Sequence, residues 1–325
     1  MPNAPRDLAS VRGLSVGQAE DPKGRSGVTA VLFDDGAPSV VDVRGGASAT
    51  YDTASLSLEA TFGRRWGIFL AGGSLFGLDA ARGVRTRLLE IGRGTPAFAR
   101  GPTLVPISGA ALYDLGGAGW EMPDYLALGY EAARQAGSAE VATGPHGAGA
   151  GATVGKYLGR AHAMAGGVGS RAAAVAGGGR IGVLVAVNSV GAIRAPVSGR
   201  WLAGALGAGG RLLPPTRVGR LAPASRGTTL AVVATDLDIG RPALARIASM
   251  VHAGLARTIV PYLTATDGDL VFASATAAGG KPPSEANPGA VADRLGATAA
   301  ELAVEAVAQA VGARGRRAGS RTVRD

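Results

Sequence analysis

The sequence predicts an α+β fold in which helices cover β-sheets. Short apolar runs, typical of buried strands, alternate along the chain with longer amphipathic stretches of helical periodicity. Hydrophobic residues make up 46% of the 325 residues, enough for a substantial core in one large domain or two ordinary ones. The 53 glycines and few aromatic residues indicate a core of small side chains with closely approaching backbones.

The first part of the chain combines an arm, strands and two helices. Residues 1–26 are polar and interrupted by Gly and Pro, which indicates an irregular arm. Apolar runs at 28–33 and 39–43 flank Asp34-Asp35-Gly36-Ala37-Pro38, a pattern typical of a β-hairpin. The elements expected next are a strand at 66–70, a helix at 78–90, a loop at 102–119 and a helix at 123–136.

In the second part, a Gly- and Ala-rich loop at 144–155 leads to Lys156, and the run from Ile181 to Asn188 predicts a buried strand with a polar end. Residues 207–227 contain Gly, Pro and Arg but no acidic residue, which indicates an exposed linker. The elements expected after it are a strand from Thr228, a helix at 241–260 with Pro242 in its first turn, a strand at 270–273, a helix at 289–311 and a disordered basic tail at 313–325.

Composition excludes several classes of site. The sequence has no cysteine, so disulfides, thiolate metal sites and cysteine nucleophiles are excluded. The histidines, His146, His162 and His252, are not at metal-ligand spacing, and none has neighbours typical of a Ser-His-Asp triad. We therefore expect neither a metal nor a cofactor.

The formal net charge of +9 raises nucleic-acid binding as a hypothesis. Much of the excess lies in two segments without aromatic residues on which bases could stack. Their basic residues are Arg211, Arg217, Arg220 and Arg226 in the first segment, and Arg314, Arg316, Arg317, Arg321 and Arg324 in the second. We therefore expect solvated segments and no nucleic-acid partner.

The chain shows no targeting or membrane signal. Residues Met1 to Ser10 lack the apolar core of a signal peptide. No run approaches the roughly 20 apolar residues of a membrane span. We expect a soluble, cytoplasmic protein without a membrane partner.

Three motifs match known patterns only in their letters. Gly13-Leu14-Ser15-Val16-Gly17 has the form of a nucleophile elbow, but a polar segment follows it instead of a helix. The run Gly177 to Gly182 has the form of a dinucleotide-binding loop, but it precedes a strand instead of joining a strand to a helix. Gly155-Lys156 resembles the end of a phosphate loop, with Ala150 and Tyr157 where that motif needs Gly and Ser or Thr.

The most informative stretch is the apolar run that begins at Thr228, directly after the basic segment. It can be a β-strand that starts with two good strand formers, Thr228 and Thr229. Alternatively, the backbone is cut between Gly227 and Thr228. A free Thr228 would then carry a hydroxyl nucleophile and, on the same residue, an amine that acts as its base.

Other polar residues stand at the ends of apolar runs, and each has an ordinary explanation. Lys156 can be a surface lysine and Asn188 a turn residue, and Asp267-Gly268-Asp269 can be a tight turn between helix and strand. The full set consists of Tyr113, Lys156, Asn188, Thr228, Asp267 and Asp269.

Together these blocks resemble the DmpA-type aminopeptidase family, which includes the nylon-oligomer hydrolase NylC. The resemblance covers residues 10–311. It rests on Val43-Arg44-Gly45-Gly46-Ala47, Gly72 to Leu78, Gly147 to Lys156, Ala186-Val187-Asn188, Thr228-Thr229-Leu230 and Asp267-Gly268-Asp269.

The resemblance implies a four-layer αββα sandwich, made as an inactive precursor that cleaves itself once. Residues 1–227 would form the larger chain and 228–325 the smaller, and cleaved pairs would assemble into a homo-oligomer, expected to be a tetramer. Many members have asparagine before the nucleophile, whereas this chain, like other members, has glycine. Gly227 tolerates strained backbone angles and leaves its carbonyl open to attack.

The resemblance also implies roles for the site residues. Thr228 Oγ would attack the Gly227 carbonyl during cleavage and a substrate amide during turnover. Lys156 would push the Thr228 amine towards its neutral form by like-charge repulsion. Asn188 would donate to the oxyanion.

The other three residues would have supporting roles. Tyr113 would assist at the oxyanion or protonate the leaving amine. Asp267 and Asp269, one residue apart, would orient the Thr228 hydroxyl and ammonium, and could bind a cationic amine of the substrate.

The sequence thus predicts an amide hydrolase that acts through an acyl-enzyme on Thr228. Its expected substrates are linear amides such as 6-aminohexanoate oligomers, or short peptides. The alternatives are an N-terminal-nucleophile acyltransferase, an aminopeptidase or amidase for small peptide amides, and an uncleaved binding protein that kept the fold.

Overall fold

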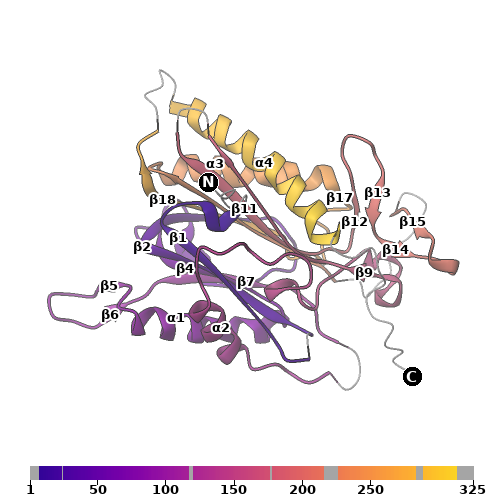
Figure 1. Ribbon diagram of the computed structural model, residues 1–325, viewed down its shortest axis with the longest axis horizontal. Helices are drawn as coiled ribbons and strands as arrows, with labels where there is room; N and C mark the ends of the chain where they lie inside the picture. Colours follow the sequence, from indigo (N-terminus) through magenta and orange to yellow (C-terminus); the bar gives the residue numbers. More distant parts are fainter. Residues whose placement is uncertain are drawn as a thin grey trace.

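The computed structural model describes residues 7–23, 25–116, 120–175, 178–215, 226–282 and 288–312. In these ranges, two stacked sheets lie between two pairs of helices (Figure 1). Helices α3 (Arg241–Thr258) and α4 (Pro288–Gly312) cover one outer face. Helices α1 (Ala80–Glu90) and α2 (Tyr125–Arg134) cover the other. The predicted α+β fold with four αββα layers is confirmed.

The sheet next to α3 and α4 positions the site. Its strands, in spatial order, are β10 (Gly167–Ala174), β11 (Arg180–Asn188), β16 (Thr228–Leu237), β18 (Leu270–Gly280) and the second half of β2 (Gly27–Val43). Strand β16 is antiparallel to β11, with Asn188 opposite Thr228, and parallel to β18. The end of β11 therefore meets the beginnings of β16 and β18 at one edge of the sheet.

The sheet next to α1 and α2 contains the first half of β2. Its other strands are β1 (Leu14–Glu20), β4 (Arg64–Ala71), β7 (Ile107–Ala111) and β3 (Ala49–Tyr51). Outside the two sheets lie the short strands β5 (Thr95–Pro96), β6 (Thr103–Leu104), β8 (Thr153–Val154), β9 (Met164–Ala165), β12 (Ala192–Arg194), β13 (Trp201–Ala203), β14 (Ala205–Leu206), β15 (Leu212–Leu213) and β17 (Ile259–Val260).

The predicted hairpin at residues 28–43 is wrong, because β2 is one strand shared by both sheets. Residues 28–32 pair with β4, and residues 39–43 pair with β18. The polar segment between them is a bulge in which the register shifts between Leu32 and Ala37. Gly36 has φ +69° there, and a Cβ on it would lie 2.9 Å from the Trp66 ring, so the bulge requires glycine.

Side-chain alternation along the strands divides the core into three layers. In β11, Val183 and Val185 pack against α3 and α4, whereas Leu184 faces the other sheet. In β2, Leu32 packs against α1 and α2, whereas Val31 lies between the sheets. Strands buried on both faces read as continuous apolar runs, which explains why β11 and β16 were predicted correctly.

The four predicted helices and the strand at 66–70 are confirmed within a few residues at their ends. Pro242 lies in the first turn of α3, as expected. The Asp124 side chain accepts a hydrogen bond from the Ala127 amide at 3.0 Å and caps α2.

Other expectations were wrong where tertiary pairing overrides weak local signals. The expected arm at 1–26 contains β1, which pairs with β2, and the expected loop at 102–119 contains β7. Both strands are rich in small or polar residues and have low strand propensity. Within the expected linker, β15 pairs with β14, and among its described residues 208–211 and Arg226 are exposed whereas the others are half-buried or buried. Residues 216–225 and the basic tail at 313–325 lie outside the described residues.

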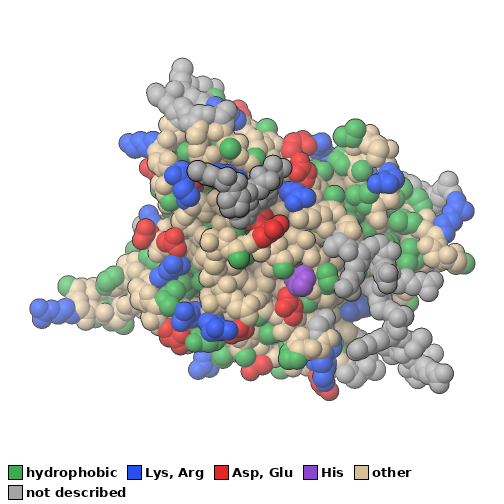
Figure 2. All heavy atoms as spheres, viewed as in Figure 1, with side chains coloured by type: hydrophobic (Ala, Val, Ile, Leu, Met, Phe, Trp, Pro, Cys, Tyr) green, Lys and Arg blue, Asp and Glu red, His purple; other side chains and the backbone are tan. Residues whose placement is uncertain are grey.

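The described helices include none that is both long and apolar enough to cross a membrane. On the face shown in Figure 2, basic and acidic side chains are interspersed. The part of this face that is described therefore presents no continuous basic surface of the kind that binds nucleic acid.

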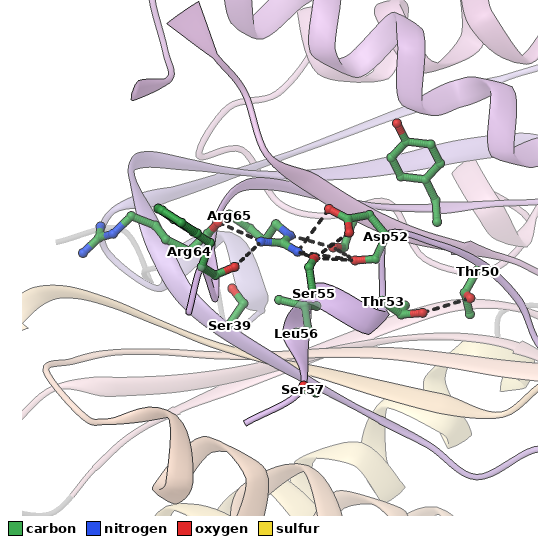
Figure 3. Close-up of polar contacts among 12 residues, drawn as sticks. Ser39, Thr50, Asp52, Thr53, Ser55, Leu56, Ser57, Arg64 and Arg65 are labelled. Carbon is green, nitrogen blue, oxygen red and sulfur yellow. Dashed lines mark hydrogen bonds and ion pairs between the residues drawn. The ribbon is translucent and has the colours of Figure 1, made fainter. Parts of the chain in front are cut away.

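A buried arginine ties β4 to the turn that follows β3 (Figure 3). Arg65 is 1% exposed, and its Nε donates to the Ser108 hydroxyl at 2.7 Å. Its guanidinium also pairs with the Asp52 carboxylate at 3.2 Å and donates to the Ser55 hydroxyl. The neighbouring Arg64 extends away from this cluster. The cluster holds the end of β3, a strand that forms one wall of the site described below.

We expect Arg65→Met to lower the free energy of unfolding by about 3 kcal/mol. The substitution leaves the buried Ser108 hydroxyl without its donor, while the half-exposed Asp52 can hydrate. Urea unfolding of both proteins measures the loss. Arg64→Met is the matched control and should cost less than about 1 kcal/mol, because Arg64 is exposed. Equal losses for the two variants would contradict a structural role of the buried guanidinium.

Candidate active site

The predicted site residues converge where β11 ends and β16 and β18 begin. Asn188 lies opposite Thr228 in the sheet, and Gly227 forms a parallel bridge with Asp267. Four of them, Thr228, Asn188, Asp267 and Asp269, are at most 3% exposed. Lys156 reaches them from the glycine-rich loop and is 5% exposed. Tyr113, which follows β7 closely in the chain, is half-buried beside them.

The peptide bond before Thr228 is held on both sides. The Thr228 hydroxyl donates to the Gly227 carbonyl oxygen, and the Gly268 amide donates to the same oxygen at 3.1 Å. The Gly227 amide donates to the Thr266 carbonyl at 3.3 Å. The hydroxyl of Thr228 therefore lies next to a carbonyl whose oxygen already has an amide donor.

Lys156 and Asn188 form one hydrogen-bonded unit. Lys156 Nζ donates to the Asn188 carbonyl at 2.7 Å, the Thr153 carbonyl at 2.8 Å and Asn188 Oδ1 at 2.9 Å. Burial lowers the pKa of Lys156 to about 7, and the negative charge of Asp267 opposes this shift. Lys156 therefore changes charge near neutral pH.

The orientation of the Asn188 amide follows from its partners. Oδ1 accepts from the Thr153 amide at 2.9 Å as well as from Lys156, and Nδ2 donates to the Tyr113 carbonyl at 2.8 Å. One hydrogen of Nδ2 is used by Tyr113, and an amide nitrogen carries two. Asn188 thus links the lysine loop to the backbone of Tyr113.

The two carboxylates support the backbone around the nucleophile. Asp269 accepts hydrogen bonds from the Thr229 amide at 2.6 Å and from the Leu263 amide at 3.0 Å. Asp267 accepts from the Val190 amide at 3.3 Å and from the Thr264 hydroxyl at 2.6 Å. Their hydrogen bonds therefore go to the residue after Thr228 and to flanking loops.

The pKa values of both carboxyls are raised by burial. For Asp269 the neighbouring charge of Asp267 adds to the effect and raises the pKa to about 7. For Asp267, burial raises the pKa, and the hydrogen bonds from the Thr264 hydroxyl and the Val190 amide reduce that rise. The negative charge of Asp267 therefore disfavours ionisation of Asp269.

A glycine-containing loop closes over the carboxylate segment. The amides of Gly45 and Ala47 donate to the carbonyls of Asp269 and Asp267, each at 2.9 Å. A Cβ on Gly45 would lie less than 3.0 Å from the Asp269 amide nitrogen, so only glycine permits this approach. The loop explains the Gly-Gly pair seen in the sequence.

A pocket of ≈ 280 Å³ opens beside Thr228. Most of its lining side chains are small. It is lined by Ala47, Ala49, Ser74, Ala111, Tyr113, Arg226, Gly227, Thr228, Ala265 and Thr266. The Arg226 guanidinium carbon lies 5.3 Å from the centroid of the Tyr113 ring. A residue of the segment before the nucleophile thus contributes to the pocket.

Several residues of this site were not predicted individually. The Gly268 amide, Thr264 and the pocket residues Ser74 and Thr266 act through backbone groups or hydroxyls that have no sequence signature of their own. Two of them lay inside blocks that carried the resemblance, namely Ser74 in 72–78 and Gly268 in 267–269. Those blocks were the only signal available.

The described residues include no group of three His, Cys, Asp or Glu side chains arranged to hold a metal ion. The chemistry visible at the site is instead that of a hydroxyl, a lysine, an amide and two carboxylates. In combination these groups can activate a nucleophile and stabilise an oxyanion.

Comparison with known sequences agrees with this chemistry. The family model described as Peptidase family S58 matches residues 6–323. An uncharacterized aminopeptidase of Mycobacterium tuberculosis is 36% identical, over 92% of this chain and 92% of that protein. A 6-aminohexanoate-oligomer endohydrolase of Paenarthrobacter ureafaciens is 30% identical, over 81% of this chain and 73% of that protein.

Comparison with solved structures shows the same fold at low sequence identity. A β-aminopeptidase of a Burkholderia species matches with a TM-score of 0.66 at 21% identity, over 95% of this chain and 87% of that one. The L-aminopeptidase D-Ala-esterase/amidase of Ochrobactrum anthropi, described as a variant of the Ntn hydrolase fold, matches with a TM-score of 0.64 at 21% identity, over 95% and 85%.

Proposed function

The chain belongs to peptidase family S58 and hydrolyses amide or peptide bonds, and we propose that it does so with Thr228 as an N-terminal nucleophile that self-cleavage releases. One observation carries this proposal. The Thr228 hydroxyl lies against the Gly227 carbonyl, and the oxygen of that carbonyl is held by the Gly268 amide. This arrangement supports attack on the preceding peptide bond, because the hydroxyl lies beside that bond and an amide donor is already on the oxygen that would carry the negative charge.

In the cleavage step, a bond forms between Thr228 Oγ and the Gly227 carbonyl carbon, and the bond from that carbon to the Thr228 nitrogen breaks. The hydroxyl proton passes to the departing nitrogen. Water then hydrolyses the ester to a Gly227 carboxylate and restores the hydroxyl. The Gly268 amide stabilises the oxyanion, a contribution of about 3 kcal/mol for one such donor elsewhere.

In turnover, the freed Thr228 amine acts as the base. An unperturbed α-amine has a pKa of about 7.7–8.0, so it is partly neutral at neutral pH. It takes the hydroxyl proton as Oγ attacks the substrate carbonyl, and it returns a proton to the leaving amine. Departure of the Gly227 carbonyl frees the Gly268 amide to hold the substrate oxyanion. The second Nδ2 hydrogen of Asn188 supplies a further donor.

The remaining residues act in support. Lys156 fixes the Asn188 amide through Oδ1. Asp269 fixes the Thr229 amide and Asp267 fixes the Val190 amide, next to the ends of β16 and β11. We therefore assign the carboxylates to positioning of the backbone at the nucleophile, in place of direct contact with the substrate.

Gly227 also supports a substrate class. The cleavage ester carries Gly227 as its acyl group, on the same oxygen that carries the substrate's acyl group in turnover. A Cβ on Gly227 would lie less than 3.0 Å from Asp267 Oδ1 and from the Val190 amide nitrogen. Acyl groups whose carbon next to the carbonyl carries no side branch fit this space best. Linear amides such as 6-aminohexanoate oligomers and glycyl peptides meet that condition.

Intact mass spectrometry with N-terminal sequencing tests the proposal. The purified protein should separate under denaturing conditions into residues 1–227 and 228–325, and the second chain should begin at Thr228. A fully active protein that yields only the Met1 start would overturn the proposed nucleophile.

Gly227→Ala should slow self-cleavage at least tenfold, because the added Cβ must displace the Val190 backbone or the Asp267 carboxylate. A time course of the uncleaved band after synthesis measures the rate. Gly240→Ala is the matched control, since its Cβ would meet its nearest neighbour, in Pro242, at an ordinary 3.6 Å. Equal cleavage rates in wild type and Gly227→Ala would show that the site accommodates substitution next to the carbonyl.

A further inference from the structure

In the pocket beside Thr228, the side chain of Arg226 lies over the aromatic ring of Tyr113. The guanidinium carbon of Arg226 lies 5.3 Å from the centroid of the Tyr113 ring, within the range of a cation–π interaction. Arg226 directly precedes Gly227, and both residues line the pocket. In the cleavage ester described above, Arg226-Gly227 is the acyl group attached to Thr228. The residues around Arg226 and Gly227 are therefore the residues that would surround the acyl group of an ester on Thr228.

Among the described residues, the pocket lining includes no carboxylate that could bind a cation instead. It consists of Ala, Gly, Ser, Thr, Tyr and Arg residues. Asp267 and Asp269 are at most 1% exposed and do not line it. Their oxygens are already used by backbone amides and the Thr264 hydroxyl. This argues against the expectation that they bind a cationic amine of the substrate.

The position of the Tyr113 ring is tied to the nucleophile. The Tyr113 carbonyl accepts a hydrogen bond from Asn188 Nδ2 at 2.8 Å, and Asn188 lies opposite Thr228 in the sheet. The backbone that carries the Tyr113 ring is thus fixed relative to Thr228, and both residues line the pocket, which sets the separation between the ring and the hydroxyl. Such a separation can select the length of an acyl chain.

We propose that the ring of Tyr113 is the subsite for a cationic group at the far end of the substrate's acyl chain, which makes Tyr113 a specificity-determining residue. This inference rests on the proposed function and deepens it. The preferred acyl group is linear, unsubstituted next to the scissile carbonyl, and carries an ammonium several bonds away. In the precursor, Arg226-Gly227 occupies the place of such a group.

Two chromogenic amides of equal length test this. In 6-aminohexanoyl-p-nitroanilide the chain ends in an ammonium, and in heptanoyl-p-nitroanilide it ends in a methyl group of similar size. Wild-type protein should favour the cationic substrate by about five- to thirtyfold in kcat/KM. Tyr113→Phe should keep this preference because it keeps the ring. Tyr113→Leu should reduce it to about onefold.

Tyr51→Leu is the matched control, because the ring of Tyr51 also stacks with an arginine, Arg85 at 5.7 Å, but does not line the pocket. It should leave the preference unchanged. A wild-type preference near onefold, or its loss in Tyr113→Phe, would overturn the subsite and leave the proposed hydrolase standing. An uncleaved wild-type chain that hydrolyses neither amide would overturn the proposed function, and the subsite with it.

Discussion

Thr228→Ala is expected to remain a single chain and to lose at least about a thousandfold in hydrolase activity. Without the hydroxyl, nothing attacks the Gly227 carbonyl, so the amine that serves as base is never released. The loss of cleavage and the loss of hydrolase activity therefore both follow from removal of the Thr228 hydroxyl oxygen. Denaturing electrophoresis reports the first loss, and amide hydrolysis under saturating substrate reports the second.

Two variants separate this effect from a loss of folding. Thr229→Ala makes the same change one residue later and keeps the backbone amide that Asp269 holds, so it should still be cleaved. Thr228→Ser keeps a hydroxyl and should be cleaved and active. Cleavage of Thr228→Ala at the same bond would assign the nucleophile elsewhere.

Lys156→Met is expected to lower kcat by about 10²–10³, close to the loss of one oxyanion donor. Lys156 is the charged donor to Asn188 Oδ1, so its removal leaves that oxygen to the Thr153 donors and loosens the orientation of the Asn188 amide. Lys23→Met, at an exposed lysine, is the control and should retain activity. Unchanged kcat in Lys156→Met would confine Lys156 to a structural role.

The free energy of unfolding provides a second measurement on Lys156→Met. It is best made in the single-chain Thr228→Ala protein, with and without the Lys156→Met substitution. The folded pKa of Lys156 is about 7, below its ordinary value of 10.5. Between these pH values the unfolded chain holds a proton that the folded chain has released. The contribution of Lys156 to stability therefore rises with pH from about 7 to about 10. Urea unfolding should show this rise in the parent and a smaller one in Lys156→Met.

Strand β2 shows where local pattern was insufficient. Asp34 to Pro38 has the composition of a hairpin turn, and two apolar runs flank it. The two runs, however, pair with β4 and β18, which are distant from each other in the sequence. The chain therefore continues through a bulge instead of turning back. No local signal distinguishes these outcomes, because they differ only in which strands supply the partners.

For the site, too, the sequence predicted some features and missed others. Residue types and order along the chain indicated a hydroxyl nucleophile with Lys, Asn and Asp nearby. They could not show that both carboxylates are consumed by backbone amides, or that an arginine lies on the Tyr113 ring. These contacts join segments that are distant from each other in the sequence.

The sequence by itself determined the strongly apolar strands such as β11 and β16, the four helices, the residue types of the site and the resemblance that places Thr228 at its centre, because apolar periodicity and motif order can be read from the sequence alone. Only the tertiary structure decided that the Gly268 amide holds the Gly227 carbonyl and that Tyr113 forms a wall of the pocket. Hydrogen bonds and ring contacts of this kind depend on the register between strands. The register is established only when the strands pair in the folded protein, and it cannot be read from the composition of the sequence.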